Sequence, residues 1–484
     1  MSFEPTLNSL RRHEVPEWYH DAKFGIFVHW GLFSVPAYAP TVNGNFHESV
    51  LNHGFRSHFI NNPYAEWYLN SLRIEGSPVW EYHEKKYGGK DYDHFAGEFN
   101  RGLDEWDPTA WAGLFKDAGA RYAVLVTKHH DGFLLWPSSH PNPEKKYYHA
   151  ARDIVGDLTA AVKAKGMRMG LYYSGGLDWS FTGQPIMDAA GALTIVPRGD
   201  GYVQYVDAHY RELIDRHRPD ILWNDIAYPS TNSMLALFAY FYNANPDGLV
   251  NDRWPVFPSP LVSTIAGLGP IRRLIDRIGQ RTIAKDGVPT AKPIWCDYRT
   301  PEYAVSSQIQ KKKWEATRGI GTSFGYNAAE PSDNSLKGND IIRLLVDIVS
   351  KNGNLLLNVG PMADGTIPPE QTRALEETGQ WLSVNGGAIY GTRPWKRAEG
   401  KTDDGSDVRF TRKGNDLFAI LLGTPRDRSF IIEDLRPGRC DRVSIPGHWG
   451  NVSIEDSARG CRINMETPLA PSPAHTVRMH GAAE

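Results

Sequence analysis

Two carboxylates in this chain each follow a short apolar run that is typical of a buried strand. Asp225 comes directly after Ile221–Trp223 and one Asn, and Glu302 follows Pro301 near the end of a second strand-like run, 294–303. Hydrolysis of a glycosidic bond needs such a pair, one as nucleophile or base and the other as an acid with a raised pKa. The alternative for Asp225 is structural, because Asp often caps the next helix or begins a turn.

Three histidines also follow predicted strands. His29 ends the apolar run that starts at Lys23, and His129 and His130 follow the run 122–127. A neutral imidazole both donates and accepts, so these side chains suit the hydroxyl groups of a polar ligand. Adjacent residues of an extended segment point to opposite sides, so His129 and His130 are not expected to chelate one ion together. We therefore predict no metal and no cofactor; the alternative is core histidines that bond to the backbone.

The elements that must position these groups alternate between strands and helices. Strands are predicted at 23–29, 122–127, 167–173, 221–223, 248–254, 294–303 and 354–359, and helices at 110–118, 157–165, 203–217, 234–242, 338–350 and 369–384. Continuous apolar strands between helices indicate a parallel sheet covered on both faces. Polar residues after each strand favour a (β/α)8-like barrel of the α/β class, which carries its site at that rim. A doubly wound sheet is less favoured, because no Gly-rich dinucleotide turn follows the first strand.

Two segments fall outside this alternation. Residues 255–292 are rich in Pro and Gly, carry four arginines (Arg272, Arg273, Arg277 and Arg281), and are predicted to be a long insertion or loop with a short helix. The segment His47–Arg56 is also predicted as a loop. Both are expected to shape the outer part of the ligand site.

The pattern changes again after residue 392. Short alternating strands are predicted at 407–411, 416–422, 428–433 and 442–445, separated by turns, as in a small antiparallel β domain. We therefore predict a catalytic barrel at 1–392 and a separate β domain at 393–484.

Charge and composition exclude several classes of partner. The chain has 53 basic and 56 acidic side chains, a net charge of −3 and no basic block, which argues against nucleic acid or an anionic membrane surface. No run of about 18 apolar residues occurs, and Met1–Pro5 lacks the apolar part of a signal peptide. We expect a cytoplasmic protein unless a signal has been removed, and a homo-oligomer is compatible with the sequence. Three scattered cysteines predict neither a disulfide framework nor a zinc site.

Seven blocks of sequence resemble, in the same order, the α-L-fucosidases of glycoside hydrolase family 29. They are WYHDAKFGIFVHWG at 18–31, KHHDGF at 128–133, GLYYS at 170–174, PDILWND at 219–225, VNDRW at 250–254, SFGYN at 323–327 and NGNLLLNVGP at 352–361. The resemblance implies a distorted (β/α)8 barrel followed by a C-terminal β-sandwich. It also implies an exo-acting, retaining hydrolase that removes terminal α-linked L-fucose from oligosaccharides, glycoconjugates or other glycosides.

The resemblance also assigns roles to individual residues. It implies that Asp225 is the nucleophile. Glu66 and Trp67 match a loop that closes over the sugar, and Phe324 matches an aromatic under its methyl group. The residues that match positions gripping the sugar hydroxyls are His29, His129, His130, Tyr172 and Arg253.

Two glutamates are candidates for the acid/base, because this position varies within the family. Glu302 follows a predicted strand end on a rim loop, whereas Glu315 lies at the start of a predicted helix and is expected to be structural. We choose Glu302 and keep Glu315 as the alternative.

Two other functions stay open at the level of sequence. One is action on α-L-galactosides, alone or beside fucosides, because an apolar pocket rejects one added hydroxyl only about 10²-fold. The other is a carbohydrate-binding protein without catalysis, against which the two intact acids argue. The aglycone is not determined by these patterns.

Overall fold

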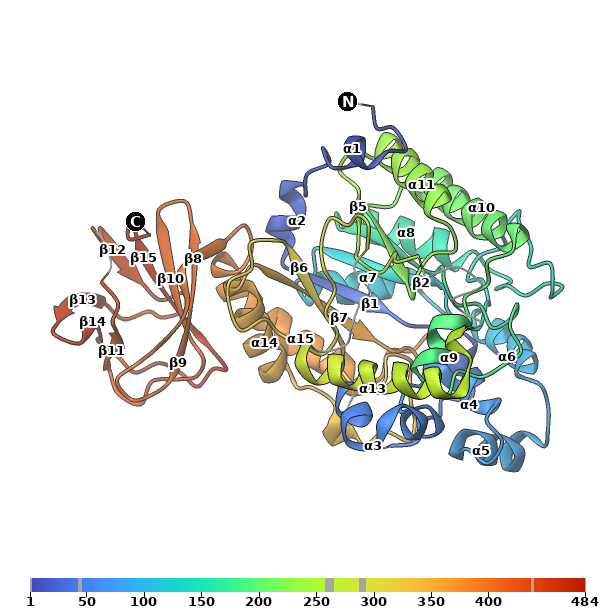
Figure 1. Ribbon diagram of the computed structural model, residues 1–484. Helices are drawn as coiled ribbons and strands as arrows, with labels where there is room; N and C mark the ends of the chain where they lie inside the picture. The colour runs from blue at the N-terminus through green and yellow to red at the C-terminus, as the bar shows by residue number, and fades with distance from the viewer. Residues whose placement is uncertain (1, 42–45, 257–264, 287–292, 437–438, 484) are drawn as a thin grey trace.

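A parallel sheet with the strand order β5-β4-β3-β2-β1-β7-β6 forms the centre of the computed structural model (Figure 1). The structure describes residues 2–41, 46–256, 265–286, 293–436 and 439–483. The strands of the sheet are β1 (Phe24–Val28), β2 (Tyr122–Lys128), β3 (Arg168–Ser174), β4 (Ile221–Asp225), β5 (Leu249–Val250), β6 (Trp314–Gly319) and β7 (Gly353–Val359). The predicted strands near 23–29, 122–127, 167–173, 221–223 and 354–359 are thereby confirmed.

An irregular segment, 297–303, lies between the two edges of this sheet. On one side, parallel bridges join Arg299 to Trp314 and Glu302 to Thr317 of β6. On the other, the backbone N–H of Asp297 donates to the carbonyl of Val250 in β5 at 3.0 Å. The segment therefore takes the eighth position of the ring, and the (β/α)8-like barrel is confirmed with one position that is not a regular strand.

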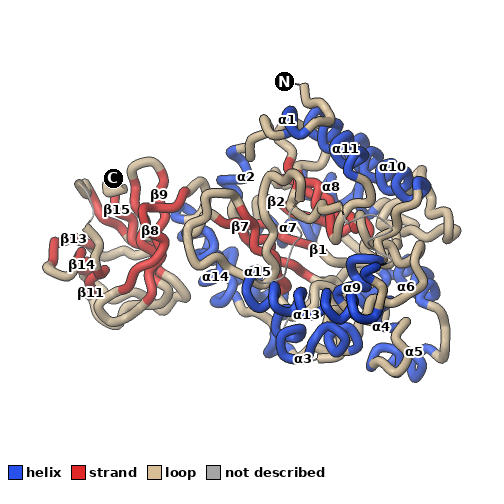
Figure 2. Tube along the Cα trace, viewed as in Figure 1, coloured by secondary structure: helices blue, strands red, loops and turns tan. Residues whose placement is uncertain are grey.

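Helices follow the strands and cover the outside of the barrel (Figures 1 and 2). In the barrel part of the chain they are α1 (Leu7–Leu10), α2 (Glu17–Ala22), α3 (Phe46–Ile60), α4 (Tyr68–Leu72), α5 (Pro78–Tyr87), α6 (Phe95–Gly102), α7 (Pro108–Asp117), α8 (Ile154–Ala164), α9 (Ala189–Thr194), α10 (Asp200–His217), α11 (Thr231–Ala244), α13 (Gly269–Asp286), α14 (Gly338–Ser350) and α15 (Pro369–Asn385). The predicted helices at 110–118, 157–165, 203–217, 234–242, 338–350 and 369–384 all correspond to observed ones.

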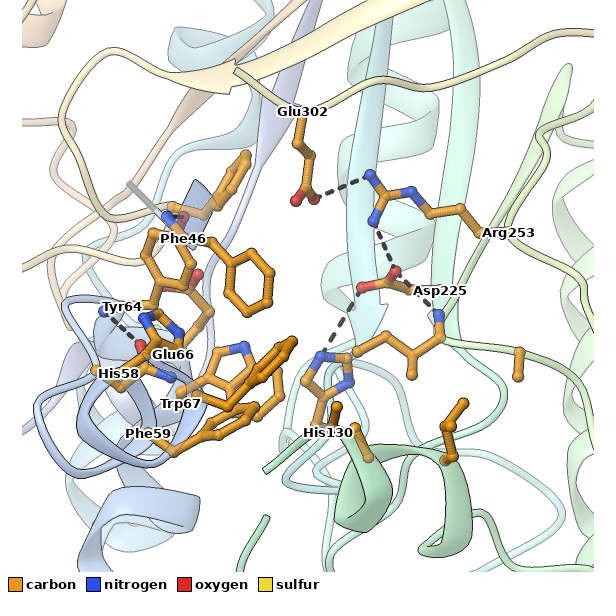
Figure 3. A pocket seen from close by; sticks show the side chains of 18 of the residues that line it. Phe46, His58, Phe59, Tyr64, Glu66, Trp67, His130, Asp225, Arg253 and Glu302 are labelled. Carbon is orange, nitrogen blue, oxygen red and sulfur yellow. Dashed lines mark hydrogen bonds and ion pairs between the residues drawn. The ribbon is translucent and has the colours of Figure 1, made fainter. Parts of the chain in front are cut away.

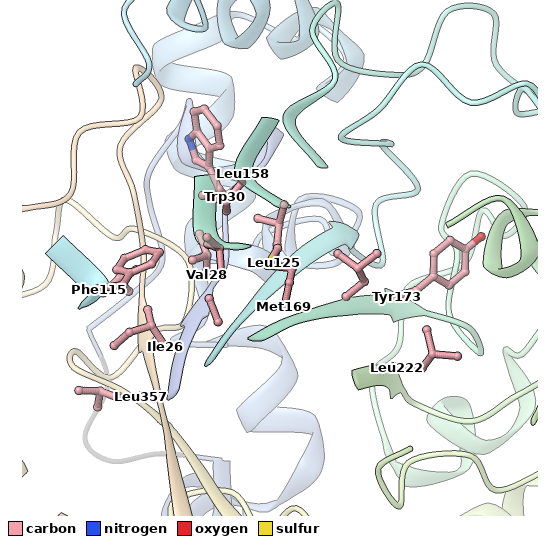
Figure 4. Close-up of a cluster of buried hydrophobic side chains, with 14 of the residues drawn as sticks. Ile26, Val28, Trp30, Phe115, Leu125, Leu158, Met169, Tyr173, Leu222 and Leu357 are labelled. Atoms are coloured by element: carbon pink, nitrogen blue, oxygen red, sulfur yellow. The ribbon is translucent and has the colours of Figure 1, made fainter. Parts of the chain in front are cut away.

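Alternation along the strands separates two apolar layers. Ile26 and Val28 of β1 pack outward in one cluster with Phe115 of α7 and Leu158 of α8 (Figure 4). Phe27, between them, belongs to a second cluster that fills the barrel interior and also contains Tyr172, Ile221 and Trp223. Successive side chains of a strand point to opposite faces, so Asp225, two residues after Trp223, points into the barrel as well.

Three expectations about local structure are wrong. Residues 47–56 are helical within α3, which bends at Gly54 (φ 80°). The insertion contains α13, an 18-residue helix where a short one was expected; its residues 257–264 and 287–292 lie outside the described part of the chain. Glu315 lies in strand β6, where a helix start was expected, because the segment 314–319 pairs with β7 along its whole length.

The C-terminal strands form two antiparallel sheets around their own apolar core. Their orders are β12-β15-β10-β9-β8 and β11-β14-β13. The strands are β8 (Arg393–Lys401), β9 (Asp407–Lys413), β10 (Asp416–Leu421), β11 (Ser429–Glu433), β12 (Arg442–Ser444), β13 (Val452–Ser457), β14 (Gly460–Met465) and β15 (His475–His480). The two sheets pack around one apolar cluster that is separate from the barrel clusters. An ion pair joins the two parts of the chain: Lys351, near the end of α14, lies 2.8 Å from Glu399 of β8. Of these strands, β9 to β12 were predicted and the others were not.

No helix among the described residues is both long and apolar enough to cross a membrane.

Close packing of α15 on the end of α7 gives a test of the fold. A Cβ atom at Gly379 of α15 would lie 2.1 Å from the backbone oxygen of Asp117. Because the clash is with backbone, we expect Gly379→Ala to lower the free energy of unfolding by about 1–3 kcal/mol. Differential scanning calorimetry should show a lower Tm for the barrel transition.

Gly113 of α7 is the matched control. It is also helical, but a Cβ there meets nothing within 4 Å. Gly113→Ala is expected to leave the Tm unchanged or raise it slightly, since Ala favours the helix by about 1 kcal/mol. Equal Tm values for the two variants would contradict this packing.

Candidate active site

A cavity of about 540 Å³ opens at the carboxyl ends of the barrel strands (Figure 3). Ten of the residues singled out from the sequence line it, namely His29, Glu66, Trp67, His129, His130, Tyr172, Asp225, Arg253, Glu302 and Phe324. They come from strand ends and loops spread over almost 300 residues of chain. The alternative acid, Glu315, does not line the cavity.

Asp225 is the last residue of β4 and lies at the bottom of this cavity, 9% exposed. Its carboxylate accepts hydrogen bonds from the Tyr172 hydroxyl at 2.9 Å, from Nη1 of Arg253 at 3.1 Å and from the backbone N–H of Ile226 at 2.9 Å. Nε2 of His130 lies 3.8 Å from the same carboxylate. These three donors hold the carboxylate in one orientation. A capping role for Asp225 is therefore not what the structure shows.

The backbone is strained immediately after each of the two candidate acids. Ile226 follows Asp225 with φ 46°, and Tyr303 follows Glu302 with φ 49°. Positive φ is unfavourable for any residue with a side chain and especially for β-branched Ile. Gly176 makes room for the first turn, because a Cβ there would lie 1.7 Å from the carbonyl oxygen of Ile226. Strain of this kind persists where the surrounding structure over-determines it, as at catalytic sites.

Glu302 is held to Asp225 through one guanidinium. Nη2 of Arg253 lies 3.0 Å from Glu302, while Nη1 of the same side chain binds Asp225. Arg253 also donates to the Thr300 side chain and carbonyl, at 3.0 and 3.1 Å. Burial alone would lower the pKa of Arg253, but the two carboxylates outweigh it and raise the pKa. Burial raises the pKa of Glu302 above its ordinary value, with Arg253 opposing and Asp225 adding to the rise.

The three histidines share one wall of the cavity. The rings of His129 and His130 are only 4.0 Å apart, and His29 lies 5.7 Å from His129. The expectation that His129 and His130 diverge is wrong, because the chain leaves β2 at Lys128 and turns there. Burial lowers the pKa of His29 to about 3 and of His130 to about 4, and lowers that of His129 well below its ordinary value. At neutral pH all three are neutral and can both donate and accept hydrogen bonds.

Metal ligation is a separate question. Within the described residues, no group of three His, Cys, Asp or Glu side chains is arranged to hold a metal ion. The hydrogen-bond partners of two of the histidines are protein groups. Nδ1 of His29 bonds to the Asn358 side chain at 2.6 Å, and Nδ1 of His130 bonds to Ser174 at 2.7 Å.

Glu66, Trp67 and Phe324 line the cavity beside the histidines: the Trp67 ring lies 5.4 Å from His130, and the Phe324 ring 5.0 Å from His29. Glu66 and Trp67 lie on the short 3-10 turn Ala65–Trp67. The Glu66 carboxyl accepts from the backbone N–H of Gly325 at 2.8 Å and from the Ser323 hydroxyl at 3.1 Å, which ties this turn to the loop that carries Phe324. Burial raises the pKa of Glu66 to about 7.

Trp223 is a residue of the site that was not predicted as one from the sequence. It lies two residues before Asp225 on the same face of β4 and lines the cavity. Its ring stacks on Tyr172 at 5.4 Å, and the Arg253 guanidinium lies 4.9 Å from its centroid. Alternate residues of a strand share one face, so the position of Trp223 two residues before Asp225 could have predicted that it lines the same cavity. Apolar residues of α3, α9 and α13 also line the cavity and were not predicted as individual site residues.

Glu315 occupies the opposite, N-terminal end of the barrel interior. It is fully buried and accepts hydrogen bonds from the hydroxyls of Tyr19 and Tyr122, at 2.8 and 2.6 Å, and from the indole of Trp223 at 3.3 Å. Burial raises its pKa to about 7, with the three donors opposing. Its side chain is below the cavity floor, so its observed contacts are those of a structural group.

Known proteins are similar to this chain over most of its length. A family model described as alpha-L-fucosidase matches residues 1–387. The alpha-L-fucosidase of Dictyostelium discoideum is 30% identical over 467 residues, which cover 94% of this chain and 88% of that protein. Thermotoga maritima alpha-fucosidase in complex with a mechanism based inhibitor is 40% identical, covers 100% of both chains and has a TM-score of 0.81. The same enzyme in complex with fucose is 39% identical, covers 99% of this chain and 100% of that one, and has a TM-score of 0.80.

The buried Glu315 makes stability depend on pH in a defined direction. Its folded-state pKa of about 7 exceeds the ordinary value of 4.5, so the folded chain binds this proton more tightly than the unfolded chain. The stabilisation is fully present below about pH 4.5 and is lost as the pH rises through about 7. Gln does not titrate. We expect Glu315→Gln to gain stability relative to wild type between pH 5 and pH 8, by about 1–3 kcal/mol.

Urea unfolding of both proteins at the two pH values measures this change. Glu66 titrates near the same pH but is present in both proteins, so it cancels in the difference. The exposed Glu75 supplies a control, and Glu75→Gln should show no such gain. If the stability difference between Glu315→Gln and wild type is constant from pH 5 to pH 8, the pKa of Glu315 is not raised in the folded chain.

Proposed function

The chain belongs to the α-L-fucosidase family of glycoside hydrolases, and on that premise we propose that Asp225 and Glu302 remove terminal α-linked L-fucose by double displacement. The observation that carries the proposal is the guanidinium of Arg253, which binds both carboxylates inside one cavity. Retaining glycosidases need two carboxyl groups across the scissile bond, one nucleophilic and one able to exchange a proton. Among the described residues, the carboxylates that line the cavity with the three histidines are Asp225, Glu302 and Glu66. Asp225 and Glu302 are the pair that Arg253 joins.

In the first step, Asp225 attacks the anomeric carbon of the fucosyl unit. The bond from that carbon to the leaving oxygen breaks, and Glu302 gives its proton to this oxygen, so the aglycone departs as a neutral alcohol. A fucosyl ester of Asp225 remains. Asp225 suits this role because Tyr172, Arg253 and the backbone aim its oxygens into the cavity. The raised pKa of Glu302 suits a group that must carry a proton at the start.

In the second step, the Glu302 carboxylate takes a proton from a water molecule while the water oxygen attacks the anomeric carbon. The ester bond to Asp225 breaks, fucose is released with its original configuration, and Glu302 is protonated again. Asp225 and Glu302 thus return to their starting states without any cofactor. A covalent step of this kind agrees with the mechanism-based inhibitor bound by the similar T. maritima enzyme.

The shape of the cavity supports exo action on a single deoxy sugar. Trp223 and Tyr172 close its floor, so a chain cannot continue through the barrel. His29, His129 and His130 offer donors and acceptors to ring hydroxyls, and Phe324 offers an apolar face for a methyl group. We propose these residues, with Glu66, Trp67 and Arg253, as the fucose-binding set, and fucosylated oligosaccharides, glycoconjugates or other glycosides as the substrates.

Replacement of the nucleophile is the direct test. Asp225→Asn keeps the shape of the side chain but removes its charge, so no ester forms. We expect hydrolysis of 4-nitrophenyl α-L-fucoside to fall by at least about 10³-fold. The circular dichroism spectrum and Tm of the variant should stay close to those of wild type. In a separate measurement, NMR of the wild-type reaction should show α-L-fucose as the first product. Near-normal turnover by a folded Asp225→Asn variant would remove Asp225 from this role.

Replacement of the acid/base should have an effect that depends on the leaving group. We expect Glu302→Gln to lose about 10²–10⁴-fold on a fucoside with a poor leaving group and much less on a dinitrophenyl fucoside, which needs no proton. Azide, which needs no general base, should attack the fucosyl ester of Asp225 in place of water, restore turnover and yield α-L-fucosyl azide.

Glu315→Gln is the matched comparison for this experiment. It should retain wild-type dependence on the leaving group and should form no fucosyl azide, because Glu315 does not reach the cavity. If azide rescues Glu315→Gln and has no effect on Glu302→Gln, the acid/base is Glu315 and not Glu302.

A further inference from the structure

The cavity has two chemically different ends. The floor carries the carboxylates, histidines and Arg253, whereas the outer part is lined by apolar side chains of α3, α9 and α13. These include Phe55 and Phe59 of α3, Leu193 of α9, and Ile275, Ile278 and Ile283 of α13. Figure 3 shows Phe46, Phe59 and Trp67 together on one side of the cavity and Asp225 on the other, with His130 next to Trp67.

The outer wall is built into the fold through its spacing along the helices. Ile275, Gly279 and Ile283 recur every four residues, so they share one face of α13, and Phe55 and Phe59 do the same on α3. The two helices approach closely, since a Cβ at Gly279 would lie 3.0 Å from the ring of Phe55. The helices α13, α3 and α9 lie side by side in Figure 1.

Polar contacts fix α13 to α9. Arg272 pairs with Asp188, the residue that caps α9, with Nη2 3.0 Å from the carboxylate. Asp276, one turn further along α13, accepts a hydrogen bond from the backbone N–H of Ala189 at 3.0 Å. The helix is therefore held against the cavity by groups that point away from the apolar lining.

This outer part offers few hydrogen-bonding groups. The polar side chains of α3 and its following loop that line it are His58 and Asn62. His58 is 1% exposed, and its Nδ1 has no hydrogen-bond partner among the described residues. A second sugar placed here would lose most of its hydrogen bonds to water without replacement, which is costly. An apolar group would gain from the burial of its surface.

We infer that the aglycone preferred by this enzyme is an apolar alcohol, such as an alkyl, aryl or terpenoid-like group, and not a second sugar. The inference rests on the proposed function, because it places the fucosyl unit on the polar floor and the leaving group against α3, α9 and α13.

A series of n-alkyl α-L-fucosides from methyl to octyl tests this directly. These alcohols have nearly equal leaving-group chemistry, so differences in kcat/KM report the binding of the chain. We expect kcat/KM to rise roughly twofold to fourfold for each methylene group that enters the cavity. The octyl compound should exceed the methyl compound by at least about 30-fold and should also exceed a fucosyl-galactose disaccharide.

Two substitutions on α13 provide a matched pair. Ile278 and Leu274 are 53% and 52% exposed, but only Ile278 lines the cavity. We expect Ile278→Asp to lower the octyl-to-methyl ratio of kcat/KM at least about tenfold, because the chain would have to pass a charged group. Leu274→Asp should leave that ratio unchanged.

The outcomes distinguish a failure of the apolar aglycone site from a failure of the proposed fucosidase activity. Hydrolysis of all the alkyl fucosides with a flat dependence on chain length, or a preference for the disaccharide, would overturn the apolar aglycone site and leave the fucosidase activity intact. Equal effects of Ile278→Asp and Leu274→Asp would also overturn it. Failure to hydrolyse any fucoside would instead refute the proposed function, and the aglycone site with it.

Discussion

The contact of one guanidinium with two carboxylates is the constraint on which the active end of the barrel depends. Arg253 is buried and charged, so it must be paired, and Asp225 and Glu302 are its partners. The three residues come from β4, from the segment after β5 and from the irregular segment 297–303. The segment 297–303, which closes the ring, brings Glu302 to the guanidinium that also binds Asp225. Closure of the ring therefore assembles the site.

The site is built from the ends of regular strands and from the least regular part of the ring. Asp225 is the last residue of β4, His29 directly follows β1, and His130 lies two residues after β2, so a regular strand leads to each of these groups. Glu302 lies on a segment joined to β6 by isolated bridges only and is followed by a strained residue. The proposed acid/base thus lies on backbone outside the regular ladder, while the proposed nucleophile ends a regular strand.

The two ends of the cavity have different structural origins. The polar floor comes from the alternating strand-and-helix pattern, whereas the apolar outer part comes from α3, α9 and α13, which lie outside that pattern. The outer helices depend on each other, through Arg272 and Asp188 and through the packing of Gly279 on Phe55. Chemistry at the sugar and choice of the leaving group can therefore change independently in this architecture.

The sequence by itself determined the strand-and-helix alternation, because apolar strands and the groups at their ends are local patterns. The ten residues that meet in the cavity were indicated mainly by the resemblance of seven ordered motifs to a known family. The sequence favoured Glu302 as the acid/base and kept Glu315 as the alternative, because this position varies within the family that the sequence resembles. The tertiary structure places only Glu302 in the cavity: pairing of β6 with β7 turns Glu315 toward Tyr19 and Tyr122 beneath the floor, and Arg253 holds Glu302 near Asp225. The apolar outer wall was likewise hidden, because which face of α13 meets α3 depends on contacts between segments more than 200 residues apart.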